Sequence, residues 1–257
     1  MTMSLHLVEH RVRDVPHRWR HRRCLQAEVE RTPGVAVARL MPNVDLRAST
    51  GGLPRPRCAA LLVGWDHRAA RDAWFADPTW PASYTQDAGE SWAVALDSVR
   101  VTRGDWHGWR PERDGAERLQ GDEPLAVLTL GFLRPRSVPA FVQGNRRVLR
   151  DLDDNPDETF RLGLMDGPLG FGTFTLWRSR AAMGRFAYGT GAHAPVRRRF
   201  DEEDRIDHPF FVRFRPVAAH GTWRGRDPLA EVRAATPAAG SARLSAADIS
   251  VVTVPRA

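Results

Sequence analysis

The sequence repeats itself, and this internal repeat limits the possible folds more than any other feature. The segment GWDHRAARDAWF at 64–75 resembles LWRSRAAMGRF at 176–186, and VRVTRGDWHGWRP at 99–111 resembles PVAAHGTWRGRDP at 216–228. The two matches occur in the same order and at nearly the same separation along the chain. Self-similarity of this kind indicates two copies of one structural unit.

Each half also predicts the same order of strands and helices. Short apolar runs bounded by Gly, Pro or Asp indicate strands, and apolar residues three or four apart indicate helices. The first half predicts a strand at 4–9, a helix at 15–30, strands at 35–40 and 58–65, a helix at 69–75 and a strand at 92–102. The second half predicts a strand at 125–133, a helix at 138–152, strands at 159–164 and 172–177, a helix at 181–188 and a strand at 210–218.

This order, β-α-β-β-α-β, is that of the ferredoxin-like fold. Such a unit has helices on one face of a four-stranded sheet, and its other face is apolar and needs a partner. We therefore predict an α+β protein in which tandem ferredoxin-like repeats form a pseudo-dimeric α/β barrel. The expected division is an N-terminal half at 1–112, a C-terminal half at 123–230 with the functional site, and a tail at 231–257 whose apolar end could add an edge strand. The polar segment from about 110 to 123 is the expected linker.

Composition narrows the classes of function. All 38 basic residues are arginine and the net charge is +7, but abundant Ala, Gly and Pro indicate a compositional bias rather than a surface selected for nucleic acid. The basic segment at 11–23 is typical of a solvent-facing helix, with docking of an acidic protein as the weaker alternative. No apolar run approaches the roughly 20 residues of a membrane span, and the N-terminus lacks a secretory signal, so we expect a cytoplasmic protein.

Three stretches of the second half carry a resemblance to a known family. They are EPLAVLTLGFLRP at 123–135, the long run NPDETF…PVRRRF at 155–200, and FVRFRPVAAHGTWRG at 211–225. Together with looser matches at 31–40, 58–65 and 90–106, they resemble the spheroidene monooxygenase family of carotenoid ketolases. The resemblance implies a dimeric α/β barrel, a b-type haem, and oxygen-dependent ketone formation on a hydrophobic substrate with electrons from a ferredoxin-like donor. The chain has no Cys-x-x-Cys-His motif, so such a haem would be bound non-covalently.

Among nine histidines, His193 is the candidate iron ligand. The resemblance places a histidine at this step, and imidazole is the usual axial ligand where thiolate is absent. A helix beginning near Pro195 would place His193 at its N-terminus, which favours the neutral form that binds metal. Arg197 and Arg198, with Arg199 after them, could reach haem propionates. The competing interpretation is a loop histidine bonded to a backbone carbonyl, followed by arginines that face water.

The remaining histidines and the apolar residues near His193 are expected by default on the surface or in the core. His6, His10, His17 and His21 are expected on a solvated face, and His107 has no carboxylate or cysteine at ligand spacing. The apolar residues near the candidate ligand are expected in the core, and would line a pocket only if haem binds between sheet and helices. They are Trp177, Met183, Phe186, Leu164, Phe174 and Leu176.

These observations lead to one hypothesis and two alternatives. The hypothesis is an oxidoreductase, a haem-dependent monooxygenase acting on a hydrophobic or nitrogen-containing natural product. One alternative is a haem-dependent lyase of the aldoxime-dehydratase type, which consumes no external electrons in turnover. The other is a barrel that binds a small molecule without catalysis. No catalytic residue is identified, and both a monomer and a homodimer are compatible with the sequence.

Overall fold

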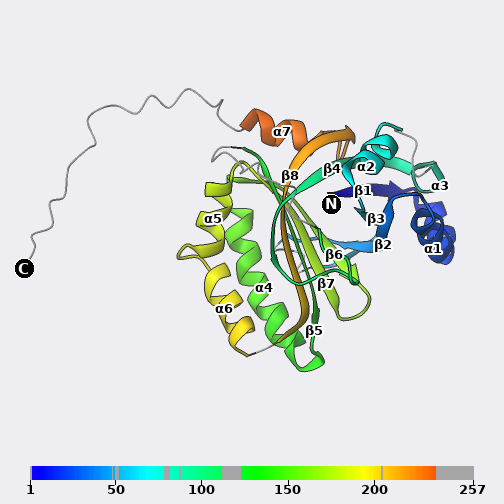
Figure 1. Cartoon of the computed structure of the whole chain (residues 1–257). Coiled ribbons are helices and arrows are strands. Elements are labelled where there is room, and N and C mark those ends of the chain that lie inside the picture. Colours follow the sequence, from blue (N-terminus) through cyan, green and yellow to red (C-terminus); the bar gives the residue numbers. More distant parts are fainter. Residues whose placement is uncertain are drawn as a thin grey trace, which may run out of the picture.

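Eight antiparallel strands form a closed barrel with helices packed around its outside (Figure 1). The computed structural model describes residues 2–47, 49, 52–77, 82–86, 88–111, 123–203 and 205–235. The strands are β1 (Thr2–His10), β2 (Val35–Val44), β3 (Pro54–Trp65), β4 (Ala88–Arg103), β5 (Leu125–Leu133), β6 (Glu158–Asp166), β7 (Gly170–Trp177) and β8 (Ile206–Gly221). The predicted α+β class and the barrel are confirmed, and all eight predicted strands are present with ends extended by a few residues.

Strands that correspond in the two halves occupy corresponding places in the barrel. The order around it is β1-β3-β2-β6-β7-β5-β8-β4, so each half contributes four neighbouring strands. The halves join along a long β4–β8 ladder and along a short β2–β6 contact of two residue pairs, Asn43 with Leu164 and Val44 with Gly163. The halves thus share one continuous sheet, rather than presenting two separate sheets face to face.

The helices are α1 (Val15–Glu30), α2 (Arg68–Phe75), α3 (Ala82–Thr85), α4 (Val138–Asp153), α5 (Arg180–Tyr188), α6 (His193–Glu202) and α7 (Pro228–Ala235), with 3-10 turns at Val12–Asp14 and Pro135–Ser137. Four of them match the predicted helices. The start of the predicted tail is helical in α7, whose Leu229 and Val232 pack into the barrel core. Most of the predicted linker, its residues 112–122, and the tail beyond 235 lie outside the described residues.

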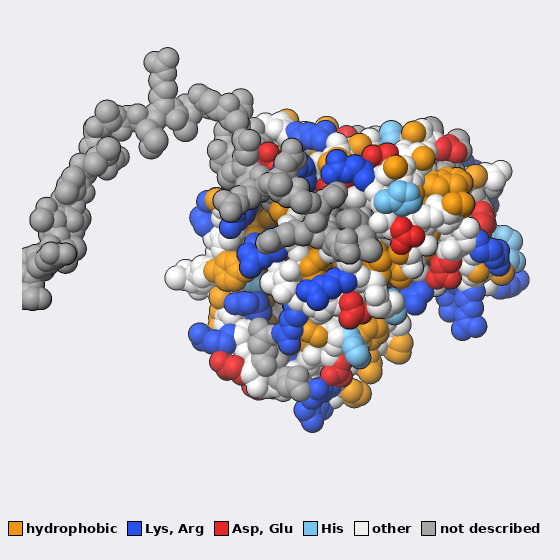
Figure 2. All heavy atoms as spheres, viewed as in Figure 1, with side chains coloured by type: hydrophobic (Ala, Val, Ile, Leu, Met, Phe, Trp, Pro, Cys, Tyr) orange, Lys and Arg blue, Asp and Glu red, His pale blue; other side chains and the backbone are white. Residues whose placement is uncertain are grey.

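Charged side chains are spread over the visible face and mixed with apolar ones, and arginines gather along α1 (Figure 2). Only Val29 of α1 is buried, as expected of a helix that faces solvent. Within the described part of the chain, none of the helices combines the length and apolar character needed to cross a bilayer.

The repeated Gly-x-Trp-x-Gly segments form the same tight turn after β4 and after β8. Gly104 and Gly221 have positive φ values of 72° and 76°. A Cβ atom at Gly104 would lie 2.1 Å from the carbonyl oxygen of Pro209, and one at Gly221 would lie 2.2 Å from that of Ser91. Both positions therefore require glycine for conformation and for space, which explains why the two halves share this sequence.

Strand β1 is buried almost throughout. The expectation that His6 and His10 lie on a solvated face is therefore wrong. His6 Nε2 lies 3.0 Å from Ser4 Oγ, on the side of β1 that α2 covers, and its ring is 6.3 Å from that of Phe75. Burial lowers the pKa of His6 from 6.5 to about 3, with a further contribution from His220. Burial likewise lowers the pKa of His10 to about 4. Both side chains are therefore neutral in the folded protein at ordinary pH.

Acid is expected to destabilise the fold through these two histidines. The unfolded chain takes up protons near pH 6.5 and the folded chain does so only near pH 3 to 4, so stability falls as the pH is lowered through that window. Each histidine contributes a slope of up to roughly 1.4 kcal/mol per pH unit. Urea unfolding between pH 7 and 5 should show a shallower slope in His6→Asn than in the parent, and an unchanged slope in His17→Asn on exposed α1. An unchanged slope in His6→Asn would contradict this assignment.

A buried ion pair fixes α2 to the sheet. Arg71 is 2% exposed, and its Nη1 donates to Asp97 Oδ1 at 2.5 Å and to the Leu96 carbonyl at 2.9 Å. Arg68 reaches the other Asp97 oxygen at 2.7 Å, but its own side chain is half exposed. A charge buried this deeply is tolerated only when it is paired and hydrogen-bonded.

Arg71→Met should therefore lower the free energy of unfolding by about 3 kcal/mol, because it leaves Asp97 buried without its main partner. Arg68→Met provides the matched control, since it removes an exposed arginine from the same carboxylate and should cost about 1 kcal/mol or less. Equal losses for the two variants in urea titrations would show that burial of Arg71 is not the source of the effect.

Candidate functional site

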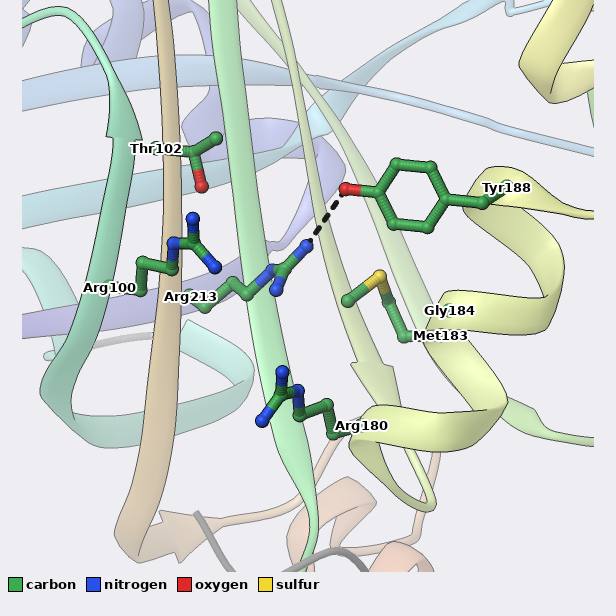
Figure 3. A pocket seen from close by; sticks show the side chains of 7 residues that line it. All are labelled: Arg100, Thr102, Arg180, Met183, Gly184, Tyr188 and Arg213. Atoms are coloured by element: carbon green, nitrogen blue, oxygen red, sulfur yellow. Dashed lines mark hydrogen bonds between the residues drawn. The ribbon is translucent and has the colours of Figure 1, made fainter. Parts of the chain in front are cut away.

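A cavity of about 330 Å³ lies between α5 and the outer face of β4 and β8 (Figure 3). We call it the outer cavity. Strand alternation builds its sheet wall, because Val212 and Phe214 face the barrel interior and Arg213 between them faces outward. Its lining residues are Arg100, Thr102, Arg180, Met183, Gly184, Tyr188 and Arg213.

Three arginines make the outer cavity strongly positive. Arg100 and Arg213 are directly opposite each other in the β4–β8 ladder, an arrangement that is unfavourable for like charges. Among the described residues, neither they nor Arg180 forms an ion pair with a carboxylate. Arg213 Nη2 donates to the Tyr188 hydroxyl at 3.1 Å, and Figure 3 shows the guanidinium groups directed into the same space. The arrangement is suited to a ligand that carries carboxylate or phosphate groups.

His193 is the first residue of α6 and lies against the end of α5. Its Nδ1 is 3.3 Å from the Ala187 carbonyl oxygen, which accepts the Nδ1 proton and leaves the Nε2 lone pair available. Burial lowers its pKa below the ordinary value, so the imidazole is neutral near pH 7. A metal-ligating histidine has this arrangement, with one ring nitrogen held by a hydrogen bond and the other available. The same carbonyl bond also fits the competing interpretation, in which the histidine bonds a backbone carbonyl and binds no metal.

Of the apolar residues predicted near His193, one group lies beside it. The His193 ring is 4.9 Å from Phe186, and Phe186 is 5.1 Å from Trp177. Trp177 and Met183 belong to one cluster on the outer face of the sheet, and Met183 also lines the outer cavity. His193 itself is not among the residues that line that cavity.

The other three apolar residues predicted near His193 lie on the opposite side of the sheet. Leu164, Phe174 and Leu176 are in the barrel interior, packed with residues from all eight strands. The sheet itself separates them from His193, so they cannot line one slot with it. Phe174 and Leu176 are two residues apart and share a face, whereas Trp177 takes the opposite face. These three residues therefore occupy the core, as expected by default, on the other side of the sheet from His193.

The predicted arginines after His193 diverge. Arg197 lies over the Tyr188 ring, with its guanidinium carbon 5.3 Å from the ring centre, and so approaches the outer cavity. Arg198 is exposed and 3.9 Å from Glu202, and Arg199 pairs with Glu203 at 2.8 Å. Arg198 is therefore directed along the exposed surface of α6 rather than into the cavity.

Sequence reasoning missed Arg100, Arg180 and Arg213. The signal for Arg213 is present in FFVRFRPV, where single arginines interrupt a strand that is otherwise apolar. Sequence reasoning also dismissed His107 for want of a carboxylate at ligand spacing. In the folded chain, Asp166 from the other half lies 3.0 Å from its Nε2, so that dismissal is corrected.

Comparison with known proteins gives relatives in sequence and in structure. No family model matches the chain. The spheroidene monooxygenase of Rhodobacter capsulatus is 29% identical over 185 residues, which cover 70% of this chain and 76% of the relative. The chain is thus related to the spheroidene monooxygenases. The spheroidene monooxygenase of Rubrivivax gelatinosus is 28% identical over 195 residues, covering 76% of this chain and 73% of the relative.

Among solved structures, an aldoxime dehydratase in complex with butyraldoxime aligns with a TM-score of 0.53 and 11% identity. The alignment covers 89% of this chain and 80% of that one. At this identity the likeness concerns the fold alone. The resemblance to spheroidene monooxygenases expected from the sequence is confirmed, and it spans both halves of the barrel.

The residues around α5 and α6 fit a haem in their chemistry. His193 offers a neutral imidazole with Nε2 available, and the three cavity arginines offer partners for propionates. A haem iron needs only one such protein ligand. The absence of any cluster of three or more His, Cys, Asp or Glu side chains among the described residues therefore does not bear on it.

Removal of one cavity arginine should stabilise the ligand-free protein. Arg213→Met relieves the repulsion across the β4–β8 ladder, and we expect the free energy of unfolding to rise by about 0.5 kcal/mol at low ionic strength. The gain should shrink as salt screens the charges. Arg198→Met is the control, because its side chain is exposed and far less crowded. A destabilised Arg213→Met variant, with no dependence on salt, would contradict the electrostatic description of the cavity.

Proposed function

We propose that the protein is a haem-dependent monooxygenase that oxidises a hydrophobic or nitrogen-containing natural product. The sequence relationship to two spheroidene monooxygenases supports an oxygen-dependent oxidoreductase. The single observation that supports haem is the orientation of His193, whose Nδ1 is held by the Ala187 carbonyl while Nε2 is available. Turnover would draw electrons from a separate donor, for which a small ferredoxin-like protein is the candidate.

In this proposal His193 binds the iron, and the outer cavity supplies the charges that hold the propionates. Arg213, kept in position by the Tyr188 hydroxyl, and Arg180 are better placed for this role than Arg198. Met183 and Trp177 contribute apolar surface that excludes water from the space under α5. Haem, when bound, supplies oxygen activation and the transfer of an oxygen atom to the substrate.

We also propose that the barrel consists of two tandem ferredoxin-like units. Equivalent strand positions in the two halves support this, as do the matching glycine turns after β4 and β8. On this view the haem site belongs to the C-terminal unit alone, because the N-terminal unit has no histidine at the position equivalent to α6.

The proposal predicts a haem absorption spectrum that depends on His193. Protein reconstituted with haem should show a Soret band, and His193→Ala should lose or shift it. His17→Ala on exposed α1 should leave the band unchanged, which separates ligation from general loss of a histidine. The ligand-free His193→Ala protein should remain folded by circular dichroism, because the histidine is only half buried.

The two remaining functions appear as other outcomes of the same experiment. A Soret band with turnover that needs neither oxygen nor reductant would indicate a lyase of the aldoxime-dehydratase type. A colourless parent after full reconstitution would contradict the haem assignment and leave a small-molecule-binding barrel. A Soret band that is identical in His193→Ala would retain haem and reject His193 as its ligand.

A further inference from the structure

A second cavity, of about 350 Å³, lies at one end of the barrel and takes its walls from both halves. We call it the barrel-mouth cavity. The turn after β4 contributes one wall, and the ends of β5 and β8 and the β6–β7 hairpin contribute the others. Its lining residues are Asp105, Trp106, His107, Gly108, Leu130, Gly131, Phe132, Asp166, Phe171, His208 and Phe210. None of them lines the outer cavity, and none is used by the proposed haem site.

A histidine–aspartate pair lies at the polar edge of this cavity. His107 Nε2 is 3.0 Å from Asp166 Oδ2, and both side chains are partly exposed, with exposed fractions of 30% and 22%. A carboxylate oxygen accepts hydrogen bonds, so the contact directs an Nε2–H of His107 to Asp166, and the tautomer with its single proton on Nε2 presents a lone pair at Nδ1. The pair therefore offers an acceptor, of the kind that takes a proton or a hydrogen bond from a ligand hydroxyl.

The turn that carries His107 is held in a conformation with backbone strain. His107 has a φ of 52°, which is uncommon for a residue with a side chain. Two backbone hydrogen bonds, of 2.8 and 2.9 Å between Trp106 and Trp109, close the turn, and Asp105 accepts from the Gly108 amide at 2.8 Å. The equivalent turn after β8 holds Arg224 at a φ of 57°, so this conformation belongs to the repeated turn, which here fixes His107 at the cavity edge.

A hydrogen-bond donor without a partner lies in the same wall. Trp106 is only 3% exposed, and its buried indole Nε1 makes no hydrogen bond among the described residues. Its ring centre is 5.9 Å from that of His107. A buried donor left unpaired is energetically unfavourable, and a ligand acceptor would remove that cost.

We propose that the barrel-mouth cavity binds an aromatic ligand that carries a hydroxyl group. Trp106, Phe132, Phe171 and Phe210 supply aromatic surface for a planar ring system. A hydroxyl is the group that both donates, to His107 Nδ1, and accepts, from the Trp106 indole. The lining includes two carboxylates and no arginine, so an anionic ligand is disfavoured here, in contrast to the outer cavity. This inference goes beyond the proposed function and does not depend on haem.

The test uses 2-naphthol as the probe and the haem-free protein. Binding is followed by the ¹H–¹⁵N resonance of the Trp106 indole, identified with Trp106→Phe, and by calorimetry. We expect 2-naphthol to move this resonance and naphthalene, which lacks the hydroxyl, to bind more weakly. His107→Asn keeps a residue that tolerates positive φ and should weaken 2-naphthol binding by about tenfold, the effect of losing one hydrogen bond to the ligand.

Arg224→Asn is the matched control. Arg224 holds the equivalent place in the turn after β8 and has a similar φ of 57°, but it lines neither cavity. Its replacement should leave the affinity nearly unchanged. Equal losses in the two variants, naphthalene binding as tight as that of 2-naphthol, or binding abolished by Arg213→Met would each overturn the proposal. If Trp106→Phe does not fold, the comparison of His107→Asn with Arg224→Asn decides alone.

Discussion

Closure of the eight-stranded sheet is the constraint on which the rest of the structure depends. Because the long β4–β8 ladder and the short β2–β6 contact join the two halves, alternate residues of every strand point into one shared interior. Leucine, phenylalanine and tryptophan side chains fill that interior, and α7 adds Leu229 and Val232 to it. The described cavities therefore lie outside the filled barrel, under a helix or at a barrel end.

The two halves fill the space between their second helix and the sheet in different ways. Aligned on their shared Ala-Ala pair, Arg71 of α2 corresponds to Met183 of α5, and Asp72 corresponds to Gly184. In the first half, Arg71 occupies the space between helix and sheet and pairs with Asp97. In the second half, a methionine and a glycine leave that space open, and Arg213 projects into it from the sheet. One half thus fills this position with a buried ion pair, and the other leaves a cavity there.

Local sequence patterns predicted the helices and strands well. They could not predict the contacts between the two halves, which depend on how distant strands pair. The bounds of α1 and β5 follow from spacing and from prolines and glycines near their ends. It was harder to predict which side chains of β7 face the barrel interior. Helices cover the outside of the barrel, so both Phe174 and Trp177 are buried. The pair Arg100 and Arg213, and the pair His107 and Asp166, each join residues from different halves. A single sequence carries no signal for such contacts until the strand register is known.

Strand β8 contributes to both cavities through the simple alternation of its side chains. His208 and Phe210 line the barrel mouth, and Phe210 faces the interior, whereas Arg213 faces outward under α5. The first site is aromatic with carboxylates at its edge, and the second is positive with arginines unpaired by described acids. Because one cavity lies under α5 and the other at a barrel end, their opposite charges do not meet inside the barrel. The closed sheet therefore keeps two chemically different cavities apart without placing their charges in its core.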